Sequence, residues 1–522
     1  MKNFYFRTSL GKNTGIGNYM RISRIATLLE KRGHACTIFI DRNLKNFNFF
    51  KNQKIKFLYK NKKRINEKDD ANLFISQTSS AGTVILDDYR FQKTWQKKIK
   101  SYHKKLIVID DFLNRSYNCD ILINSKPDFL NKKFKDLFKK KNNNIKLLLG
   151  PKYCVLDKKI KKNKQSRKKF IITFYNGGSG DLLPIFNILK ELNDTKLNYF
   201  KVFKFNVIMG AFANHKDKIF SLKKKFKNIE IIDSRNDIYK KINHSDLFIG
   251  SAGISIFETA LYKIPTVLFK VSKNQEVDLN SLEKIGHYLL LEKSDLYKKE
   301  KITKLIILLH KKYSNFKKIS SCPEFKVDDK GANRIVGEIL SGTKTMFKLD
   351  KEKKNKLMNK KQVYNISKVN GKYINKYLLS RNLKINRINS LDKRKIDNLN
   401  HYLWWFNNKR KSFIFKKNQD EIIFFYHEII KIKNFSFIKP GWCAINNEIS
   451  FLDILRALEV QKKIIDKQNY SIPNLGIIKK SNTSMVKFAK NLNWKIIHKH
   501  ENIHKILCKN LNLKKEFVLF KR

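Results

Sequence analysis

The chain opens with an apolar run, a glycine loop, an amphipathic helix pattern and a second apolar run, and this order most constrains its fold. Residues 4–6 are the first run, Gly15-Ile16-Gly17 is the loop, residues 19–32 carry apolar side chains at helical spacing, and residues 36–40 form the second run. A glycine loop between a strand and a helix lets backbone N–H groups approach an anion. The same pattern is typical of a plain strand-to-helix turn, so the loop predicts either a nucleotide site or a simple connection.

The alternation of strands and helices continues over the first part of the chain. Apolar runs at residues 83–87, 106–109 and 121–124 are separated by helical patterns, which is typical of a parallel sheet with helices on both faces. Asp87-Asp88 and Asp110-Asp111 end the first two runs. Ligands bind outside the carboxyl ends of such strands, although helix N-caps are the alternative role for these carboxylates. We predict a Rossmann-like domain over residues 1–155.

A lysine-rich hinge at residues 158–169 leads into a second unit of the same design. Residues 170–174 predict a strand, and the loop at residues 176–180 follows it as a second phosphate-type loop. A third glycine loop, at residues 251–255, precedes a helix that carries Glu258. We predict a second Rossmann-like domain over residues 165–342. Two doubly wound units joined by a hinge leave a cleft, which is the usual place for a nucleotide-sugar.

The last third of the chain has a different pattern. Residues 343–380 are charged and weakly periodic, which predicts a linker with one solvated helix. Residues 381–522 predict a smaller α+β domain with strands near residues 412–415, 421–427 and 471–478.

Composition limits the class of protein. A chain of 522 residues with 42% hydrophobic residues is expected to form about two to four folded domains. No run approaches the roughly 18 apolar residues of a membrane span, and the N-terminus has no signal-peptide pattern, so we expect a cytoplasmic protein. The six cysteines are scattered without a CxxC pair, which predicts neither disulfides nor a zinc site. The sequence does not indicate the oligomeric state.

The formal charge of +67 suggests a polyanion partner. Lysine is nevertheless spread over the whole chain, and no nucleic-acid motif accompanies it. We therefore expect a solvated basic surface and no nucleic-acid partner, with a polyanion or anionic membrane role as the alternative. Such a charge would attract a phosphorylated substrate.

An ordered set of motifs in residues 1–310 resembles the UDP-sugar hydrolases of pseudaminic acid biosynthesis, which have a GT-B-like fold. The matching segments are Phe6-Arg7-Thr8, Gly15-Ile16-Gly17 with Met20-Arg21, Arg32-Gly33-His34, Ile85-Leu86-Asp87-Asp88-Tyr89, Ile109-Asp110-Asp111, Cys119-Asp120-Ile121-Leu122, Leu149-Gly150-Pro151-Lys152-Tyr153, Gly177-Gly178-Ser179, Ala252-Gly253 with Glu258, and Asn274-Gln275. The resemblance implies an α/β fold made of a GT-B-like pair of Rossmann-type domains.

The resemblance also implies that the Rossmann-like domain at residues 165–342 is UDP-binding, and it implies roles for individual residues. Gly253 would face the phosphates of UDP, Glu258 would accept hydrogen bonds from the ribose hydroxyls, and Asn274-Gln275 would contact the sugar. A solvated acid in the first helical turn is the alternative role for Glu258. The substrate-binding set implied in this way is Gly15, Gly17, Arg21, Tyr89, Gly178, Ser179, Gly253, Ser255, Glu258, Asn274 and Gln275.

One position departs from the family pattern. The family has a histidine after its glycine loop, the residue taken to be the base that activates water, and this chain has Asn18. An amide cannot act as a general base, but it can orient water or a sugar hydroxyl. We therefore predict a catalytic set of Asn18 with Asp87, Asp88 and Asp110, and Asp111 is a further candidate base. A buried carboxylate with a raised pKa could replace the histidine.

Residues 381–522 resemble the GNAT N-acetyltransferases more distantly. The matching segments are Glu421-Ile422-Ile423-Phe424-Phe425, Asn482-Thr483-Ser484-Met485, Phe488-Ala489, Leu492-Asn493-Trp494, and His401 with Trp404-Trp405-Phe406. The glycine loop that cradles the acetyl-CoA diphosphate is missing after residue 437. The resemblance implies a smaller α+β GNAT-like domain that either binds acetyl-CoA differently or no longer binds it. Core packing is the alternative for Trp404-Trp405, and a helix N-cap is the alternative for Asn482.

The resemblance of residues 1–310 implies an inverting hydrolase of a UDP-2,4-diacetamido-2,4,6-trideoxy-hexose, in a nonulosonic acid pathway. Hydrolysis would need no cofactor and no metal, whereas acetyl-CoA would serve the C-terminal domain. A glycosyltransferase using the same cleft is the first alternative. A non-catalytic UDP-sugar-binding protein is the second, because of Asn18.

Overall fold

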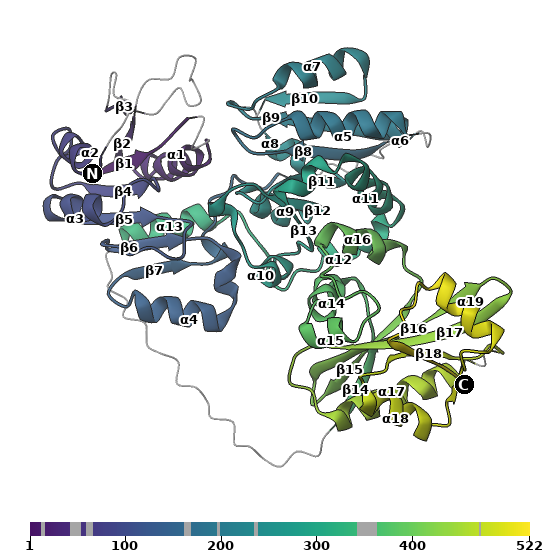
Figure 1. The fold of residues 1–522 in the computed structure, drawn as a ribbon. Helices are drawn as coiled ribbons and strands as arrows, with labels where there is room; N and C mark the ends of the chain where they lie inside the picture. The colour runs from purple at the N-terminus through teal and green to yellow at the C-terminus, as the bar shows by residue number, and fades with distance from the viewer. Residues whose placement is uncertain are drawn as a thin grey trace. The chain divides into compact units, whose positions relative to one another are not determined.

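The structure is a computed structural model, and it describes residues 1–11, 16–41, 54–58, 66–160, 169–195, 199–233, 238–341, 363–468 and 471–522. The chain forms two compact units, Met1–Leu349 and Asp350–Arg522 (Figure 1). The first unit contains two lobes, each built on one parallel sheet, and the second unit contains two antiparallel sheets.

The first lobe is built on a parallel sheet with the strand order β3-β2-β1-β4-β5-β6-β7. Its strands are β1 (Asn3–Thr8), β2 (Ala35–Ile40), β3 (Ile55–Phe57), β4 (Thr83–Asp87), β5 (Lys105–Ile109), β6 (Ile121–Asn124) and β7 (Lys146–Leu149). Its helices are α1 (Gly17–Glu30), α2 (Glu67–Ile75), α3 (Lys93–Tyr102) and α4 (Lys132–Lys141). Ile22 and Ile25 of α1 pack on one face of the sheet, whereas Phe74 of α2 and Trp95 of α3 pack on the other.

The second lobe repeats the design with the order β10-β9-β8-β11-β12-β13. Its strands are β8 (Phe170–Tyr175), β9 (Phe203–Met209), β10 (Ile229–Asp233), β11 (Leu247–Ser251), β12 (Thr266–Lys270) and β13 (Leu289–Glu292). Its helices are α5 (Leu183–Asp194), α6 (Tyr199–Val202), α7 (Lys216–Lys225), α8 (Ile238–Asn243), α9 (Ser255–Tyr262), α10 (Leu279–Lys284), α11 (Lys299–Lys311) and α12 (Tyr313–Ser320). Both sheets reverse strand order beside their first strand, as Rossmann-type sheets do, so the predicted α/β pair of Rossmann-type domains is confirmed.

One helix returns from the second lobe to the first. Helix α13 (Gly331–Leu340) buries Ile335, Val336 and Ile339 in the same apolar cluster as Phe4 and Ile22 of the first lobe. At its start, a Cβ on Gly331 would lie 1.9 Å from the carbonyl oxygen of Cys154. The helix therefore fastens onto the first lobe at the point where the chain leaves it.

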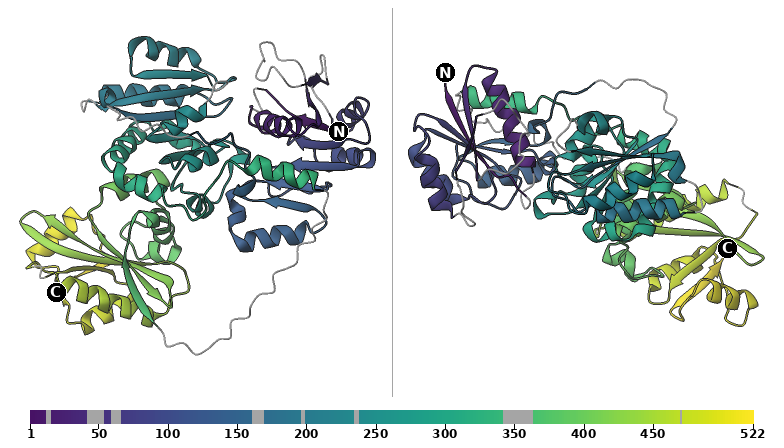
Figure 2. Two further views of the ribbon diagram at one scale, coloured as in Figure 1. Left: turned by 180° about the vertical axis from the view of Figure 1, so that it is seen from behind. Right: turned by 90° about the horizontal axis from the view of Figure 1, so that it is seen from above.

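The second unit has a four-stranded antiparallel sheet with the order β14-β15-β16-β17. These strands are β14 (Tyr364–Lys368), β15 (Lys411–Lys417), β16 (Asp420–Ile432) and β17 (Phe435–Ala444). Helices α14 (Ile374–Arg381), α15 (Lys384–Ile388) and α16 (Asn398–Asn407) lie toward one face, and α17 (Phe451–Asp466) lies toward the other (Figure 2).

A second, three-stranded antiparallel sheet completes this unit. Its order is β18-β20-β19, with β18 (Leu475–Lys479), β19 (Lys495–Ile496) and β20 (Phe517–Lys521), and its helices are α18 (Thr483–Asn491) and α19 (Asn502–Asn510). An isolated parallel bridge between Ile438 and Asn474 joins the two sheets beside the start of β18.

The predicted linker at residues 343–380 does not hold for its second half. Strand β14 pairs with β15 from Tyr364 opposite Lys417 to Lys368 opposite Phe413. Helix α14 buries Tyr377 and Leu378. The hydrophobic pattern of residues 364–368 is weak because β14 is a short edge strand with exposed side chains.

Candidate functional site

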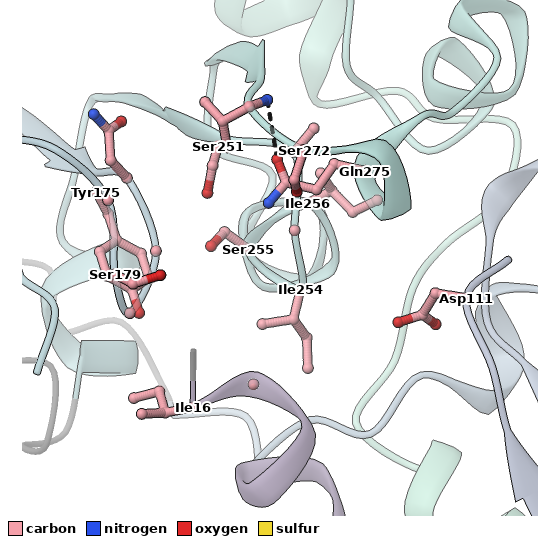
Figure 3. Close-up of a pocket in the computed structure, with 18 of the residues that line it drawn as sticks. Ile16, Asp111, Tyr175, Ser179, Ser251, Ile254, Ser255, Ile256, Ser272 and Gln275 are labelled. Atoms are coloured by element: carbon pink, nitrogen blue, oxygen red, sulfur yellow. Dashed lines mark hydrogen bonds between the residues drawn. The ribbon is translucent and has the colours of Figure 1, made fainter. Parts of the chain in front are cut away.

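A cleft of about 880 Å³ lies in the first unit, at the carboxyl ends of both parallel sheets. The first lobe contributes residues that follow β1, β4, β5 and β6, and the second contributes the loops after β8, β11 and β12. Doubly wound sheets bind ligands at this edge. The two lobes therefore bring the predicted glycine loops to a shared cleft (Figure 3).

Most of the predicted site residues line this cleft. They are Gly17, Asn18, Arg21, Tyr89, Gly178, Ser179, Gly253, Ser255, Glu258 and Gln275. Gly15 lies outside the described residues. Asn274 lies in the short helical turn Lys273–Gln275, and its side chain is not among those that the structure describes.

The loop after β8 is held rigidly by the loop after β9. Gly177 has a φ of +81°, which favours glycine, and Phe212 N donates to Gly178 O at 2.8 Å. A Cβ on Gly210 would lie 2.3 Å from Gly178 O and 2.4 Å from Gly177 O. This close approach fixes the backbone of the phosphate-type loop before any ligand is bound.

Gly253 and Gln275 face each other across the second-lobe side of the cleft. A Cβ on Gly253 would have Gln275 Nε2 at 3.6 Å as its nearest neighbour. Gln275 Oε1 accepts a hydrogen bond from Val271 N at 3.3 Å, drawn as a dashed line in Figure 3. The amide nitrogen of Gln275 therefore points toward Gly253, where it can donate to a ligand.

Glu258 is a buried carboxylate in the wall of the cleft. It lies in the first turn of α9, is 2% exposed, and its Oε2 has no hydrogen-bond partner within the described residues. Burial raises its pKa to about 7, although Arg24 and Tyr239 act to lower it. A solvated first-turn acid is excluded by this burial. An unpartnered buried oxygen is costly, so it is suited to accept a hydroxyl of a ligand.

Arg21 organises the carboxylates of the first lobe. It donates from Nε and Nη2 to the two oxygens of Asp87 at 2.7 and 2.8 Å, and from Nη1 to both oxygens of Asp111 at 3.0 and 3.1 Å. The Tyr89 hydroxyl donates to Asp111 Oδ2. Burial acts to raise the pKa of Asp111, but Arg21 and this hydroxyl hold it below its ordinary value. Arg21 and Tyr89 thus hold an ionised Asp111, which points into the cleft (Figure 3).

Three of the predicted candidate bases do not line the cleft, so their prediction as bases is wrong. Asp87, Asp88 and Asp110 are absent from the described lining of the cleft. Asp87 is completely buried against Arg21, and Asp88 Oδ2 accepts from Arg90 Nη2 at 2.6 Å.

Asp110 fails for a similar reason. Its Oδ1 accepts from Phe112 N at 2.6 Å, and burial raises its pKa to about 7. Asp111, the next residue, lines the cleft instead.

Asn18 lies at the start of α1 and lines the cleft while remaining 8% exposed. Its Nδ2 donates to Asp87 O at 3.3 Å. This contact ties the amide to the end of β4 and leaves its oxygen as the acceptor for water or a hydroxyl.

The sequence did not single out a lysine that joins the lobes. Lys126 follows β6, lines the cleft, and donates from Nζ to Glu276 O of the second lobe at 2.7 Å. Asp278 N donates to Asp128 Oδ1 at 3.1 Å beside it. Because the chain contains 112 lysine and arginine residues, nothing in the sequence distinguishes Lys126 from the others.

The C-terminal unit places its predicted residues mainly in packing roles. His401 is buried, with Nε2 against Ile374 O at 2.7 Å, and Trp404 stacks with Tyr377 at a centroid distance of 5.7 Å. Asn482 Oδ1 accepts from Met485 N at 3.4 Å, as a helix N-cap. These packing and capping contacts explain why His401, Trp404 and Asn482 occur at their positions, and no ligand is needed for the explanation.

Among the described residues, no three histidine, cysteine or acidic side chains cluster in a way that would hold a metal ion. None of the helices in the described ranges combines the length and the apolar character that a membrane span requires.

No protein-family model matches the chain, and no curated protein matches it. Among solved structures, MurG from Acinetobacter baumannii is similar at 11% identity and a TM-score of 0.44, over 65% of this chain and 99% of that one. The S. aureus MnaA–UDP co-structure is similar at 13% identity and a TM-score of 0.44, over 65% and 96%. WaaG, a glycosyltransferase involved in lipopolysaccharide biosynthesis, is similar at 11% identity and a TM-score of 0.39, over 66% and 100%.

Proposed function

We propose that the first unit is an enzyme that binds a UDP-sugar in the cleft and releases UDP by displacement at the anomeric carbon. The observation that carries this proposal is Glu258, a buried carboxylate with a free oxygen beside two glycine loops. A carboxylate can accept both hydroxyls of a ribose, and glycine loops bring backbone N–H groups to phosphate oxygens. Gln275 lies beside them as a donor to the sugar.

The preferred reaction is hydrolysis of a UDP-2,4-diacetamido-2,4,6-trideoxy-hexose to UDP and the free sugar. Water attacks C1 on the face opposite UDP, the bond from C1 to the phosphate oxygen breaks, and its electron pair leaves with UDP. Asp111 takes the proton of the water, and Asn18 orients that water. Because Arg21 keeps the pKa of Asp111 low, Asp111 is a weaker base than a histidine, so hydrolysis is slow.

The test is UDP release from that substrate by the purified full chain, without an acceptor. Asp111→Asn should lower the rate by about 10²–10⁴-fold, the usual cost of losing a general base. Asp136→Asn on the exposed side of α4 is the matched control and should leave the rate unchanged. An unchanged rate in Asp111→Asn would remove Asp111 from the mechanism.

Two alternatives give different outcomes in the same assay. A glycosyltransferase would release UDP only with an acceptor, whose hydroxyl proton Asp111 would then take. A non-catalytic UDP-sugar-binding protein would bind UDP and release none from any donor. Asn18 favours this second alternative, since it removes the histidine that the related hydrolases are taken to use.

For the C-terminal unit we propose a GNAT-like fold. Its support is the strand order of the two sheets and the isolated parallel bridge between Ile438 and Asn474 that joins them. The residues at the start of α17 do not fit the diphosphate of acetyl-CoA. Ser450 caps Asp453 N at 3.1 Å, and the Asp453 carboxylate lies in the first turn, 3.2 Å from Lys417 Nζ. Calorimetric titration of the full chain with acetyl-CoA tests this, and we expect binding weaker than that of UDP.

A further inference from the structure

Four polar side chains from separate parts of the first unit meet in the wall of the cleft. Arg24 comes from α1, Asp157 from the segment that leaves the first lobe, Tyr239 from α8, and Glu258 from α9. Arg24 belongs to none of the motifs that carry the family resemblance.

Arg24 is fixed in place by contacts with two of these segments, those that carry Asp157 and Tyr239. It donates from Nε and Nη2 to the two oxygens of Asp157 at 2.8 and 2.9 Å. Its Cζ lies 5.2 Å from the centre of the Tyr239 ring, within the range of a cation–π contact. The side chain is 12% exposed, so its charge is poorly screened by solvent. A cation of the first lobe is therefore held against the second lobe.

Glu258 is surrounded by groups from each element that packs on it. The charged groups are Arg24 and Asp157, and the neutral acids are Tyr239, Tyr175 and Cys154. Arg24 is the cation of this set, and Asp157 is a second anion. Arg24 acts to lower the pKa of Glu258, whereas burial and Asp157 act to raise it.

We propose that Arg24 is a positioning residue that keeps Glu258 negatively charged for the ribose hydroxyls of UDP, and that Asp157 limits this effect by pairing with Arg24. The inference rests on the proposed function, because Glu258 must be the ribose acceptor. It makes UDP affinity depend on the ion pair between Arg24 of α1 and Asp157 of the segment that leaves the first lobe.

The proposal predicts opposite effects for the two partners. Arg24→Met removes the cation, so Glu258 ionises at a higher pH. Asp157→Asn removes an anion and frees Arg24 for Glu258, so Glu258 ionises at a lower pH. A purely structural role for the pair predicts that both variants weaken UDP binding in the same way at every pH, because both break the same contact.

The experiment measures the dissociation constant of UDP by calorimetry between pH 5.5 and 9 for the full chain and its variants. Glu258→Gln supplies the baseline, because the titration of UDP's own phosphate is common to all variants. Relative to this baseline, the wild type should gain affinity as the pH rises through the pKa of Glu258. We expect Arg24→Met to raise the midpoint by about one pH unit, which is about tenfold weaker binding between the two midpoints. Asp157→Asn should lower the midpoint.

Two further variants keep the result interpretable. Arg24→Lys retains the charge and should restore the wild-type midpoint, and Arg32→Met, exposed just after the same helix, should leave it unchanged. Midpoints that stay at the wild-type value in both Arg24→Met and Asp157→Asn, with UDP still bound, overturn this inference alone. Absence of UDP binding by the wild type overturns the proposed function and this inference with it.

Discussion

Arg21 and Asp87 form a two-point ion pair inside the first lobe, with Nε–Oδ2 at 2.7 Å and Nη2–Oδ1 at 2.8 Å. Asp87 is completely buried, so Arg21 is its compensating charge. The same guanidinium holds Asp111 at the cleft. Arg21 therefore contributes to the stability of the first lobe through Asp87. It also positions the proposed base, Asp111.

Arg21→Met should strongly destabilise the first unit. It leaves Asp87 buried without its partner, which typically costs about 3–5 kcal/mol. Urea unfolding of the full chain, followed by far-ultraviolet circular dichroism, measures the loss. Arg32→Met is exposed and should change the free energy of unfolding by less than about 0.5 kcal/mol. Equal effects of the two substitutions would contradict the importance of the buried pair.

Glu258→Gln should stabilise the free protein at alkaline pH. The folded pKa of about 7 lies above the ordinary value of 4.5, so the folded state binds more protons between these values. Stability therefore falls as the pH rises from about 4.5 to 7, and the penalty above pH 7 is on the order of 3 kcal/mol. Thermal unfolding at pH 5 and pH 8 tests this.

The substitution should raise the melting temperature mainly at pH 8. A gain of the same size at both pH values would mean that ionisation of Glu258 is not the cause. Weaker UDP binding by the same variant would show that the wild type retains an unfavourable buried charge for its ligand.

The two parallel sheets could be predicted because strands buried on both faces appear as uninterrupted apolar runs, such as residues 83–87 and 106–109. The second-lobe side of the cleft could be predicted from the glycine loops that follow the strands. A loop with a positive φ, such as that of Gly177, favours glycine and is therefore visible in the sequence. These features depend on local residue type and spacing alone.

Features that depend on tertiary packing could not be predicted. Nothing in the sequence distinguishes Asp110 from Asp111, because the choice depends on which side chain faces the second lobe. Arg24 and Lys126 act through partners 133 and 150 positions away along the chain, Asp157 and Glu276. Strand β14 was missed because a short edge strand buries too little apolar surface to leave a pattern.

Asn18→His should raise the rate of UDP release, if hydrolysis at C1 is the reaction. A neutral imidazole accepts a proton at neutral pH, and a general base contributes about 10²–10⁴-fold. The rate of the variant should increase with pH through about 6.5, the ordinary histidine pKa, whereas the wild type lacks this step. Asn18→Gln keeps an amide and is the matched control. No gain in the histidine variant would mean that residue 18 does not face the attacking water or that the substrate is a different one.

Gly210→Ala should weaken UDP binding by displacing the loop after β8, although Gly210 itself does not line the cleft. The new Cβ would lie 2.3 Å from Gly178 O, so the loop after β8 must move, and tight clashes of this kind cost about 1–3 kcal/mol. Gly337→Ala in α13 is the matched control, because its Cβ meets nothing within 4 Å. In a helix interior that change should stabilise the protein by about 0.5–1 kcal/mol. UDP titration should show weaker binding for Gly210→Ala alone. Unchanged affinity there would mean that the interlocked loops after β8 and β9 do not set the diphosphate site.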